Sequence, residues 1–281
     1  MTFYALHIAA NKTNRLEPLR AACEKVGVDF VALDPSDFDF SASSPVKKGD
    51  IVYRTNRGKQ LRFFEDYLVR KGVVTFYQNE IFHKPDPFML EKNGIATPKS
   101  IFCFSRRRKM LTEYVTKLGG FPIVVKALGG TRGMGVMKVE SFPVLFSIVD
   151  FLMAQGKLLV LKKFIAVKNS ARLIVLGNKV IASIEYEAPQ RDFRTNALQK
   201  PVVKPKKYSA AVEKLAVRAT QAMGWEFSGV DILIDSSDGK KAYVAEVNFP
   251  CNFMRAQKTL DQDIALQMVK FLVAKSKRLS S

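Results

Sequence analysis

The first 80 residues alternate between short apolar runs and longer segments with apolar residues at helical spacing. The short runs are typical of strands and lie at residues 3–10, 28–35, 50–56 and 73–79. The segments 13–27 and 61–72 are typical of amphipathic helices, and Gly27 stands where the first of them is expected to stop. Because strands that alternate with helices pair in parallel, we predict a helix-flanked parallel sheet over residues 1 to about 80.

The rest of the chain is predicted to form two further units that are rich in hairpins. A short helix is expected behind Pro87, and residues 99–165 then show the order strand, helix, strand, glycine-rich turn, strand, helix, strand. From residue 170 a hairpin turned at Gly177-Asn178 precedes a polar loop, a helix, a second hairpin and a closing helix. We therefore predict an α/β protein of α+β character in three units, residues 1–96, 97–165 and 166–281.

The composition is that of a soluble globular protein with reduced thiols. The chain is 47% hydrophobic and 11% aromatic, which is enough to build a sizeable core. Its cysteines, Cys23, Cys103 and Cys251, lie far apart and match no metal-binding spacing. No signal peptide and no apolar run long enough to cross a bilayer is evident, so we expect a cytoplasmic protein without a membrane partner.

The positive charge is large and is concentrated in the second part of the chain. The formal net charge is +19. Residues 1–96 carry 14 Lys and Arg against 12 Asp and Glu, whereas residues 97–281 carry 31 against 14. This imbalance favours an anionic partner, with a merely solubilising basic surface as the alternative. A nucleic-acid partner is disfavoured because no DNA- or RNA-binding motif accompanies the charge.

Polar side chains interrupt the apolar second hairpin in a pattern that indicates a metal site. Glu246 and Asn248 lie two apart on one strand and therefore share a face. If the turn spans about Ser236 to Lys241, Asp231 lies across from Glu246 on that face. Two carboxylates and an amide provide the oxygen ligands that Mg²⁺ prefers, and buried like charges need a cation or a shared proton. A structural hydrogen-bond network is the alternative.

Two loops carry groups suited to phosphate. The stretch KALGGTRGMGV, residues 126–136, joins two strands through glycines whose N–H groups are able to surround phosphate oxygens, and Lys126 ends the preceding strand. The spacing is not that of a P-loop, and a plain hairpin turn is the alternative. In RDFRTN, residues 191–196, Arg194 is a fork-shaped donor and Asn196 a further polar ligand, although an ordinary surface loop has the same composition.

These elements in this order resemble the ATP-grasp superfamily and, within it, the RimK-type carboxylate-amine ligases. The likeness extends over about residues 80–275: GGTRGMGV is similar to the glycine loop of the family, DFRTN to its phosphate loop, and GVDIL with AEVN to its magnesium hairpin. The resemblance implies an N-terminal parallel α/β domain, 1–96, followed by a small lobe, 97–165, and a large lobe, 166–281, that clasp ATP. The segment LVLKKFI would be the hinge that offers backbone groups to adenine.

The resemblance also implies roles for individual residues. Lys126 would contact the α- and β-phosphates, with Lys84 nearby, while Arg194 and Asn196 would steady the transferred phosphate. Asp231, Glu246 and Asn248 would hold Mg²⁺ or Mn²⁺. The remaining ATP contacts would come from Gly130, Thr131, Arg132, Gly133, Met134, Gly135, Lys163, Phe164 and Arg172. The chain departs from most relatives at Lys163, which replaces a hinge glutamate, and at Ser170, which replaces an aspartate before Arg172.

The implied reaction is the ATP-dependent joining of a carboxylate to an amine through an acyl phosphate, with Lys126 and Arg194 as catalytic groups. The basic surface favours an acidic acceptor, which would be an acidic peptide, a protein C-terminus or a small acid, and glutamate is an expected amine substrate. Arg54 is a candidate clamp for a substrate carboxylate, with a surface role as the alternative. Other possibilities are an ATP-binding regulatory protein of the same fold with weakened turnover and an ATP-grasp kinase; self-association is left open.

Overall fold

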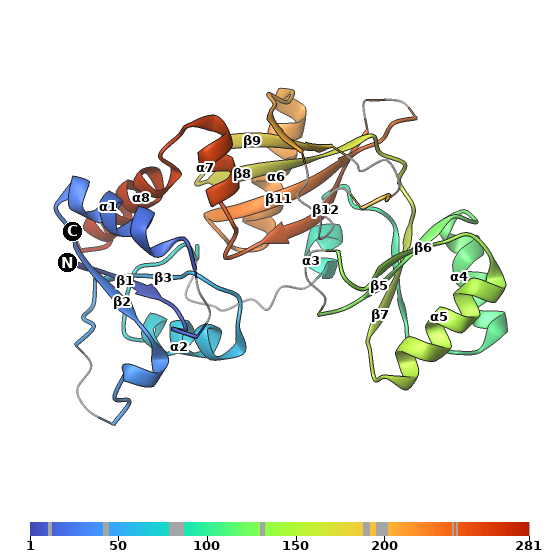
Figure 1. Cartoon of the computed structure of the whole chain (residues 1–281), viewed down its shortest axis with the longest axis horizontal. Helices are drawn as coiled ribbons and strands as arrows, with labels where there is room; N and C mark the ends of the chain where they lie inside the picture. Colours follow the sequence, from blue (N-terminus) through green and yellow to red (C-terminus); the bar gives the residue numbers. More distant parts are fainter. Residues whose placement is uncertain are drawn as a thin grey trace.

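The computed structural model describes residues 1–10, 13–41, 45–78, 87–129, 133–187, 192–194, 202–237, 239 and 241–280. Three sheets organise these residues, and each is formed by one of the three predicted units. Figure 1 shows the N-terminal and large-lobe sheets on one side of the molecule and the small lobe on the other. Among the described residues no helix is both long and apolar enough to cross a membrane.

The N-terminal domain contains the predicted parallel sheet, with three strands rather than four. Its strands β1 (Thr2–Leu6), β2 (Asp29–Leu33) and β3 (Ile51–Arg54) have the order β2-β1-β3. Helix α1 (Leu16–Val26) follows β1, a 3-10 turn, η1 (Pro35–Asp37), follows β2, and α2 (Lys59–Val69) follows β3. Each helix therefore begins at the carboxyl edge of the sheet, the edge where α/β sheets bind ligands.

The predicted fourth strand at 73–79 does not form as a regular strand in its described part. Val74 makes an isolated parallel bridge with Ile51 of β3, and Tyr77 makes an antiparallel bridge with Trp225 of the large lobe. The two ends of this apolar segment thus pair with different sheets. It connects the N-terminal domain to the large lobe rather than extending the first sheet.

The small lobe is a four-stranded sheet with two helices on one face. Strands β4 (Ser100–Cys103), β5 (Ile123–Ala127), β6 (Val136–Val139) and β7 (Leu159–Lys163) have the order β4-β7-β5-β6, and their pairing is antiparallel. Along β5, buried Ile123 and Val125 alternate with Val124 and Lys126. The buried residues pack with α4 (Arg108–Leu118) and α5 (Phe142–Ala154) on one face of the sheet. On the opposite face, the ring of Phe102 in β4 packs against that of Phe88, with centroids 4.5 Å apart.

The large lobe is a five-stranded antiparallel sheet that presents the predicted hairpins. Its strands are β8 (Asn169–Leu176), β9 (Lys179–Glu187), β10 (Val203–Pro205), β11 (Phe227–Ile234) and β12 (Ala242–Asn248), in the order β10-β9-β8-β11-β12. Helix α6 (Ala210–Ala222) packs on this sheet, α3 (Pro87–Lys92) contacts α6, and α7 (Met254–Leu260) contacts β9 and β10. Gly177 has φ 60°, the left-handed conformation required by its position in the turn between β8 and β9.

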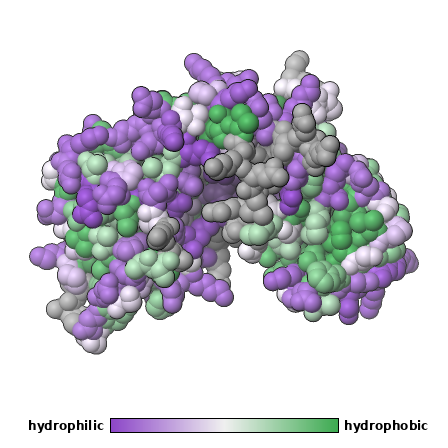
Figure 2. All heavy atoms as spheres, viewed as in Figure 1, coloured by the Kyte–Doolittle hydropathy of each residue, from purple (hydrophilic) through white to green (hydrophobic). Residues whose placement is uncertain are grey.

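The closing helix α8 (Ile264–Ser280) crosses back to the N-terminal domain. It packs on α1 and β3, Lys25 pairs with Asp263 at 2.7 Å, and the Ser276 hydroxyl donates to the Gly49 carbonyl at 2.6 Å. One continuous hydrophobic core therefore joins the N-terminal domain and the large lobe, whereas the small lobe has a core of its own. Hydrophilic side chains cover much of the surface between these two bodies (Figure 2).

Candidate active site

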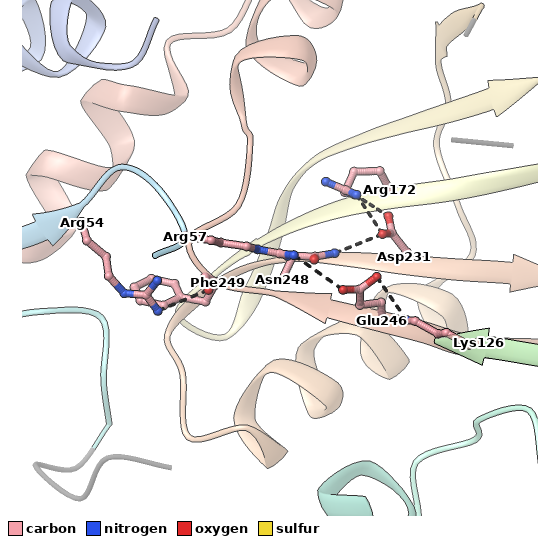
Figure 3. A network of polar contacts seen from close by, with 8 residues as sticks. All are labelled: Arg54, Arg57, Lys126, Arg172, Asp231, Glu246, Asn248 and Phe249. Atoms are coloured by element: carbon pink, nitrogen blue, oxygen red, sulfur yellow. Dashed lines mark hydrogen bonds and ion pairs between the residues drawn. The ribbon is translucent and has the colours of Figure 1, made fainter. Parts of the chain in front are cut away.

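The second hairpin holds the predicted carboxylates in register. Asp231 of β11 pairs with Glu246 of β12, and Gly229 pairs with Asn248, which confirms the register expected from the turn length. A bulge after Asp231 shifts the pairing, so that Ile232 faces Val244. The extra residue on β12 increases the local twist where the polar side chains stand. Figure 3 shows these side chains extending from β11 and β12 toward one another and toward basic groups.

Asp231 is buried and is held by two neighbours. The Arg172 guanidinium of β8 donates through Nε and Nη2 to the two carboxylate oxygens, with Nη2 to Oδ2 at 2.8 Å. The Asn248 amide nitrogen donates to Asp231 Oδ2 at 3.0 Å. Burial raises the pKa of Asp231, and the opposite charge of Arg172 counteracts this effect. Arg172, expected to contact ATP, thus supports the predicted metal ligand in this structure.

Glu246 lies in the space between the two lobes rather than in the interior. Its side chain is 42% exposed, in contrast to the burial expected from its apolar neighbours. Its carboxylate is 3.8 Å from Lys126 Nζ of the small lobe and 3.7 Å from Arg57 Nη1 of the N-terminal domain. The small lobe and the N-terminal domain therefore each direct a basic group to this carboxylate of the large lobe, as Figure 3 shows.

The oxygen donors of the hairpin fit a hard divalent cation. Carboxylate and amide oxygens are the ligands that Mg²⁺ and Mn²⁺ prefer, and Asp231, Glu246 and Asn248 stand at adjoining positions of one ladder. In the described ranges no three His, Cys, Asp or Glu side chains gather at a possible metal site. The candidate ligand set therefore has only two carboxylates, those of Asp231 and Glu246, and the side-chain amide oxygen of Asn248 would be the third ligand.

Three lysines project from the face of the small-lobe sheet that is opposite α4 and α5. Lys126 of β5, Lys138 of β6 and Lys162 of β7 share this face, because Val124 is paired with both Lys138 and Lys162 and lies two residues from Lys126. Burial, assisted by the like charge of Lys126, lowers the pKa of Lys162 to about 8. Such a face is suited to a polyanion, which would neutralise the repulsion between the ammonium groups.

The two lysines of the hinge point to opposite faces. Strand alternation places the side chain of Lys163 opposite that of Lys162, and it is exposed, so the predicted contact of Lys163 with ATP concerns its backbone only. Its backbone N–H donates to the Lys99 carbonyl at 2.9 Å, so this donor is already used within the protein. A pocket of about 370 Å³, lined by Lys163, Lys99 and Tyr243 among others, contains none of the hairpin ligands.

Phe164 lies on the same side of the hinge as Lys162. The Lys138 ammonium stands 5.0 Å from the centre of its ring, and the ring of Phe193 packs against it with an interplanar angle of 66°. This aromatic residue therefore contacts the phosphate-loop segment that precedes Arg194.

The described part of the phosphate loop meets the described part of the glycine loop. Arg194 Nη1 donates to the Gly133 carbonyl at 3.1 Å, and Nη2 donates to Asp192 at 2.7 Å. Asp192 thus orients the guanidinium. Gly135 has φ 77°, and a side chain there would come within 3.2 Å of the Ala127 side chain, so the loop needs glycine at this position.

Several predicted site residues lie outside the described residues. These are Lys84, Gly130, Thr131, Arg132 and Asn196. Met134 is described and exposed, next to Gly133 and Gly135, where the chain turns into β6.

Arg54 has a structural environment that differs from the clamp expected from the sequence. Its side chain is buried, Nε donates to Glu65 at 2.5 Å and Nη2 to the Phe249 carbonyl at 3.3 Å. Tyr77 donates to the same Glu65 oxygen at 2.5 Å. These contacts occupy N–H donors of the guanidinium that a substrate carboxylate would need. Arg57, three residues later, is the arginine of this segment that reaches the site, and sequence reasoning missed it because a surface loop gives no periodic signal.

Family comparison supports the class of protein that this fold and site define, an ATP-grasp ligase. A model of the RimK-like ATP-grasp domain matches residues 87–272. A probable alpha-L-glutamate ligase of Sodalis glossinidius is 31% identical over 282 residues, with 92% of each chain covered. A protein of the same name from Vibrio atlanticus is 30% identical over 280 residues, covering 92% of this chain and 91% of that one. The chain therefore belongs to the RimK-like ATP-grasp family, whose members are ATP-dependent ligases.

Solved structures show the same fold over nearly the whole chain. The ATP-grasp ligase PsnB, complexed with a minimal precursor, has a TM-score of 0.73 at 15% identity and covers 98% of this chain and 99% of its own. D-alanine–D-alanine ligase from Bacillus anthracis has a TM-score of 0.72 at 18% identity, with 99% and 98% covered. These likenesses confirm the predicted ATP-grasp fold, which binds ATP.

Proposed function

We propose that this ligase adds glutamate, or a closely similar amino acid, to the carboxylate of an acidic peptide or small acid. The observation that carries the proposal is the opposition of two charged faces: the lysine face of the small lobe stands across from the acid-and-amide hairpin of the large lobe, with Lys126 and Glu246 in contact. The names of the relatives and the excess of positive charge beyond residue 96 support glutamate and an acidic acceptor.

In the proposed reaction, a carboxylate oxygen of the acceptor attacks the γ-phosphorus of ATP and ADP leaves. The amine then attacks the carbonyl carbon of the acyl phosphate, inorganic phosphate leaves, and the amine proton passes to solvent. Lys126 and Lys162 would offset the negative charge of the phosphates, and Arg194 would release part of its hydrogen bonding to Asp192 to meet the transferred group. No nucleophilic side chain is needed.

The hairpin would hold the divalent cation that accompanies ATP. When bound, Mg²⁺ screens the triphosphate and the charge that develops on transfer. Asp231, Glu246 and Asn248 would be its ligands, with Arg172 fixing the orientation of Asp231. Glu246 would exchange its two distant basic neighbours, Lys126 and Arg57, for the cation and its bound phosphates, since ion pairs of 3.7–3.8 Å between part-exposed groups are weak.

The direct test is product identification. Purified protein is incubated with MgATP, a panel of amino acids and acidic peptides ending in glutamate; ADP release is measured and products are analysed by mass spectrometry. We expect a condensation product that is heavier than the acceptor by one amino acid residue, formed with one ADP per bond. Absence of ADP release with every pair would overturn the proposal, and ATP binding without release would identify the protein as a nucleotide-binding relative without turnover.

The same assay tests the assigned residues. Glu246→Gln and Lys126→Ala each remove one charged group from the site, and we expect each to lower kcat by a factor of about 10² to 10³, the usual cost of removing one transition-state stabilising group. The matched controls Glu113→Gln and Lys117→Ala make the same chemical changes at exposed positions of α4 and should keep wild-type turnover. Full activity of both site variants would show that the site is misplaced.

A further inference from the structure

A second cluster of polar donors lies at the carboxyl edge of the N-terminal sheet, outside the nucleotide site. Arg15 stands directly before α1, and Asn56 and Arg57 follow β3 directly before α2. Strands β1 and β3 are neighbours, so the segments that follow them meet at one edge, where open α/β sheets bind their ligands. Arg15 Nη1 donates to Asn56 Oδ1 at 3.2 Å, which confirms that the two segments touch.

This cluster has more hydrogen-bond donors than acceptors among the described residues. Arg15 Nε and Asn56 Nδ2 are both shielded from solvent, and neither finds a hydrogen-bond acceptor among the described residues. A buried donor without an acceptor is costly in free energy, so such groups usually mark the position of a water, an ion or a ligand. In addition, neither α1 nor α2 has a side-chain cap in the described structure, and both begin at this edge with their partially positive ends.

The cluster faces the catalytic hairpin. Arg57 Nη1 is 3.7 Å from Glu246 Oε1, and Figure 3 shows its side chain reaching from the N-terminal domain toward the side chains of β12. Burial raises the pKa of the Cys251 thiol, which follows β12, and the positive charges of Arg172, Arg15 and Arg57 counteract this rise. Arg15 and Arg57 therefore come from two different segments, and the first is linked to the second through Asn56, whose side chain Arg15 contacts and which precedes Arg57 in the chain.

The pairing between Arg57 and Glu246 does not by itself account for this cluster. Both side chains are roughly half exposed, and exposed ion pairs of this length contribute at most about 1 kcal/mol to stability. Arg54 provides the contrast, because its charge is matched by buried Glu65. Arg57 thus remains available to a ligand, and Arg15 and Asn56 have donors that lack acceptors.

We infer that Arg15, Asn56 and Arg57 bind the carboxylate of a substrate and hold it next to the metal-binding hairpin. Two guanidinium groups and an amide offer several N–H donors, and a guanidinium fork matches the two oxygens of a planar carboxylate. This inference rests on the proposed function and assigns to the N-terminal domain the recognition of an acid. The carboxylate belongs either to the acceptor that is activated or to the amino acid that attacks, and the experiment separates these two sources.

Protection from chemical modification tests occupancy without requiring turnover. Phenylglyoxal reacts with accessible guanidinium groups, and the modification rate of each arginine is followed by peptide mass spectrometry in the presence of MgADP. We expect L-glutamate or an acidic peptide ending in glutamate to slow the modification of Arg57 by about tenfold near saturation, because a charge-assisted pair masks the group. Arg70 directly follows the last residue of α2, and its side chain is 78% exposed. It is the internal control and should react at an unchanged rate.

Steady-state kinetics then identifies which substrate is held. Arg57→Ala should raise the KM for one carboxylate substrate by about 10- to 100-fold, Asn56→Ala by about 3- to 10-fold, and both should leave the KM for MgATP unchanged. Arg57→Lys should recover only part of the loss, since an ammonium cannot form the bidentate pair. An increase confined to the peptide identifies the activated acid, and one confined to L-glutamate identifies the amine substrate. Arg70→Ala is the matched control variant.

The outcomes distinguish this inference from the proposed function. Product formation with wild-type KM values in Arg57→Ala, or equal protection of Arg57 and Arg70, overturns the carboxylate site and leaves the ligase function standing. Selective protection of Arg57 without any condensation product supports the carboxylate site and counts against the proposed reaction.

Discussion

Arg54 and Arg57 lie three residues apart and have opposite environments. Arg54 ends β3, is buried, and pairs with Glu65 of α2 at 2.5 Å, while its guanidinium also stacks 5.0 Å from the Phe249 ring centre. Arg57 lies in the following loop, is about half exposed, and reaches Glu246 only at 3.7 Å. Strand alternation and the domain contact fix the first arginine, whereas the loop leaves the second free to exchange partners.

The comparison shows that burial, rather than charge or position in the sequence, separates a structural arginine from one suited to binding. A buried charge must be matched by a partner within the protein, because its desolvation is costly. A half-exposed charge keeps much of its hydration, so a ligand is able to replace its partner at small cost. Arg172 resembles Arg54, because its charge is also paired with a buried carboxylate, that of Asp231.

The largest expected effect is on stability, through Arg54→Met. Methionine keeps much of the apolar stem but leaves Glu65 buried without its cation, so we expect the free energy of unfolding to fall by about 3–5 kcal/mol in urea titrations. The double variant Arg54→Met, Glu65→Gln removes both charges and should recover part of this loss. A decrease below about 1 kcal/mol in the single variant would contradict the structural role of this pair.

An effect of intermediate size is expected at Lys162, and it concerns the affinity for MgATP. Its lowered pKa of about 8 means that most of its charge is present at pH 7 and is lost by pH 9. The phosphates of ATP would favour the charged form, so ATP binding should take up protons, and the Kd for MgATP should rise by up to about tenfold between pH 8 and 9. In Lys162→Met this increase should disappear, whereas the exposed control Lys117→Met should retain it.

The same lysine gives a stability prediction with a defined sign. Its folded-state pKa of about 8 lies below the ordinary value of 10.5, so between these values the unfolded chain binds more protons than the folded one. The contribution of Lys162 to the free energy of unfolding therefore increases as the pH rises from about 8 to 10.5. Urea titrations across this range should show a steeper increase for the wild type than for Lys162→Met; identical slopes would refute the assignment.

The smallest expected effect on stability is that of Arg57→Ala. Loss of an exposed pair should change the free energy of unfolding by less than about 1 kcal/mol, even though substrate affinity falls by one to two orders of magnitude. Measurement of both quantities on one preparation makes the comparison with Arg54 quantitative. A stability loss as large as that of Arg54→Met would mean that the two arginines have the same structural role.

Sequence patterns predicted those features that depend on local periodicity and turn chemistry. The alternation in β11 and β12, together with the turn length, placed Asp231 across from Glu246, and the glycine at 177 placed the first large-lobe hairpin. The helix-flanked parallel sheet followed from the order of the apolar runs. In each case the signal lies within a short stretch of chain.

Features that depend on contacts between distant segments were not predictable in this way. The docking of α8 on α1, the convergence of Arg57 with Glu246, and the different partners of Val74 and Tyr77 all arise from the assembled domains. The choice between Lys162 and Lys163 depended on which face of β7 carries the helices. A single sequence holds no direct record of such pairings.

The separate core of the small lobe has a consequence for nucleotide exchange. Because the buried residues of this core do not belong to the larger core, rotation of the lobe would leave both buried clusters intact. It would break contacts nearer the surface, such as Lys126 with Glu246, Arg194 with Gly133 and the ring pair of Phe102 and Phe88. Rigid-body rotation of the small lobe away from the large lobe would therefore have a low free-energy cost, and it would open the site to the entry of ATP and the release of ADP. The N-terminal domain and the large lobe, which α8 joins, would stay fixed relative to each other during this rotation.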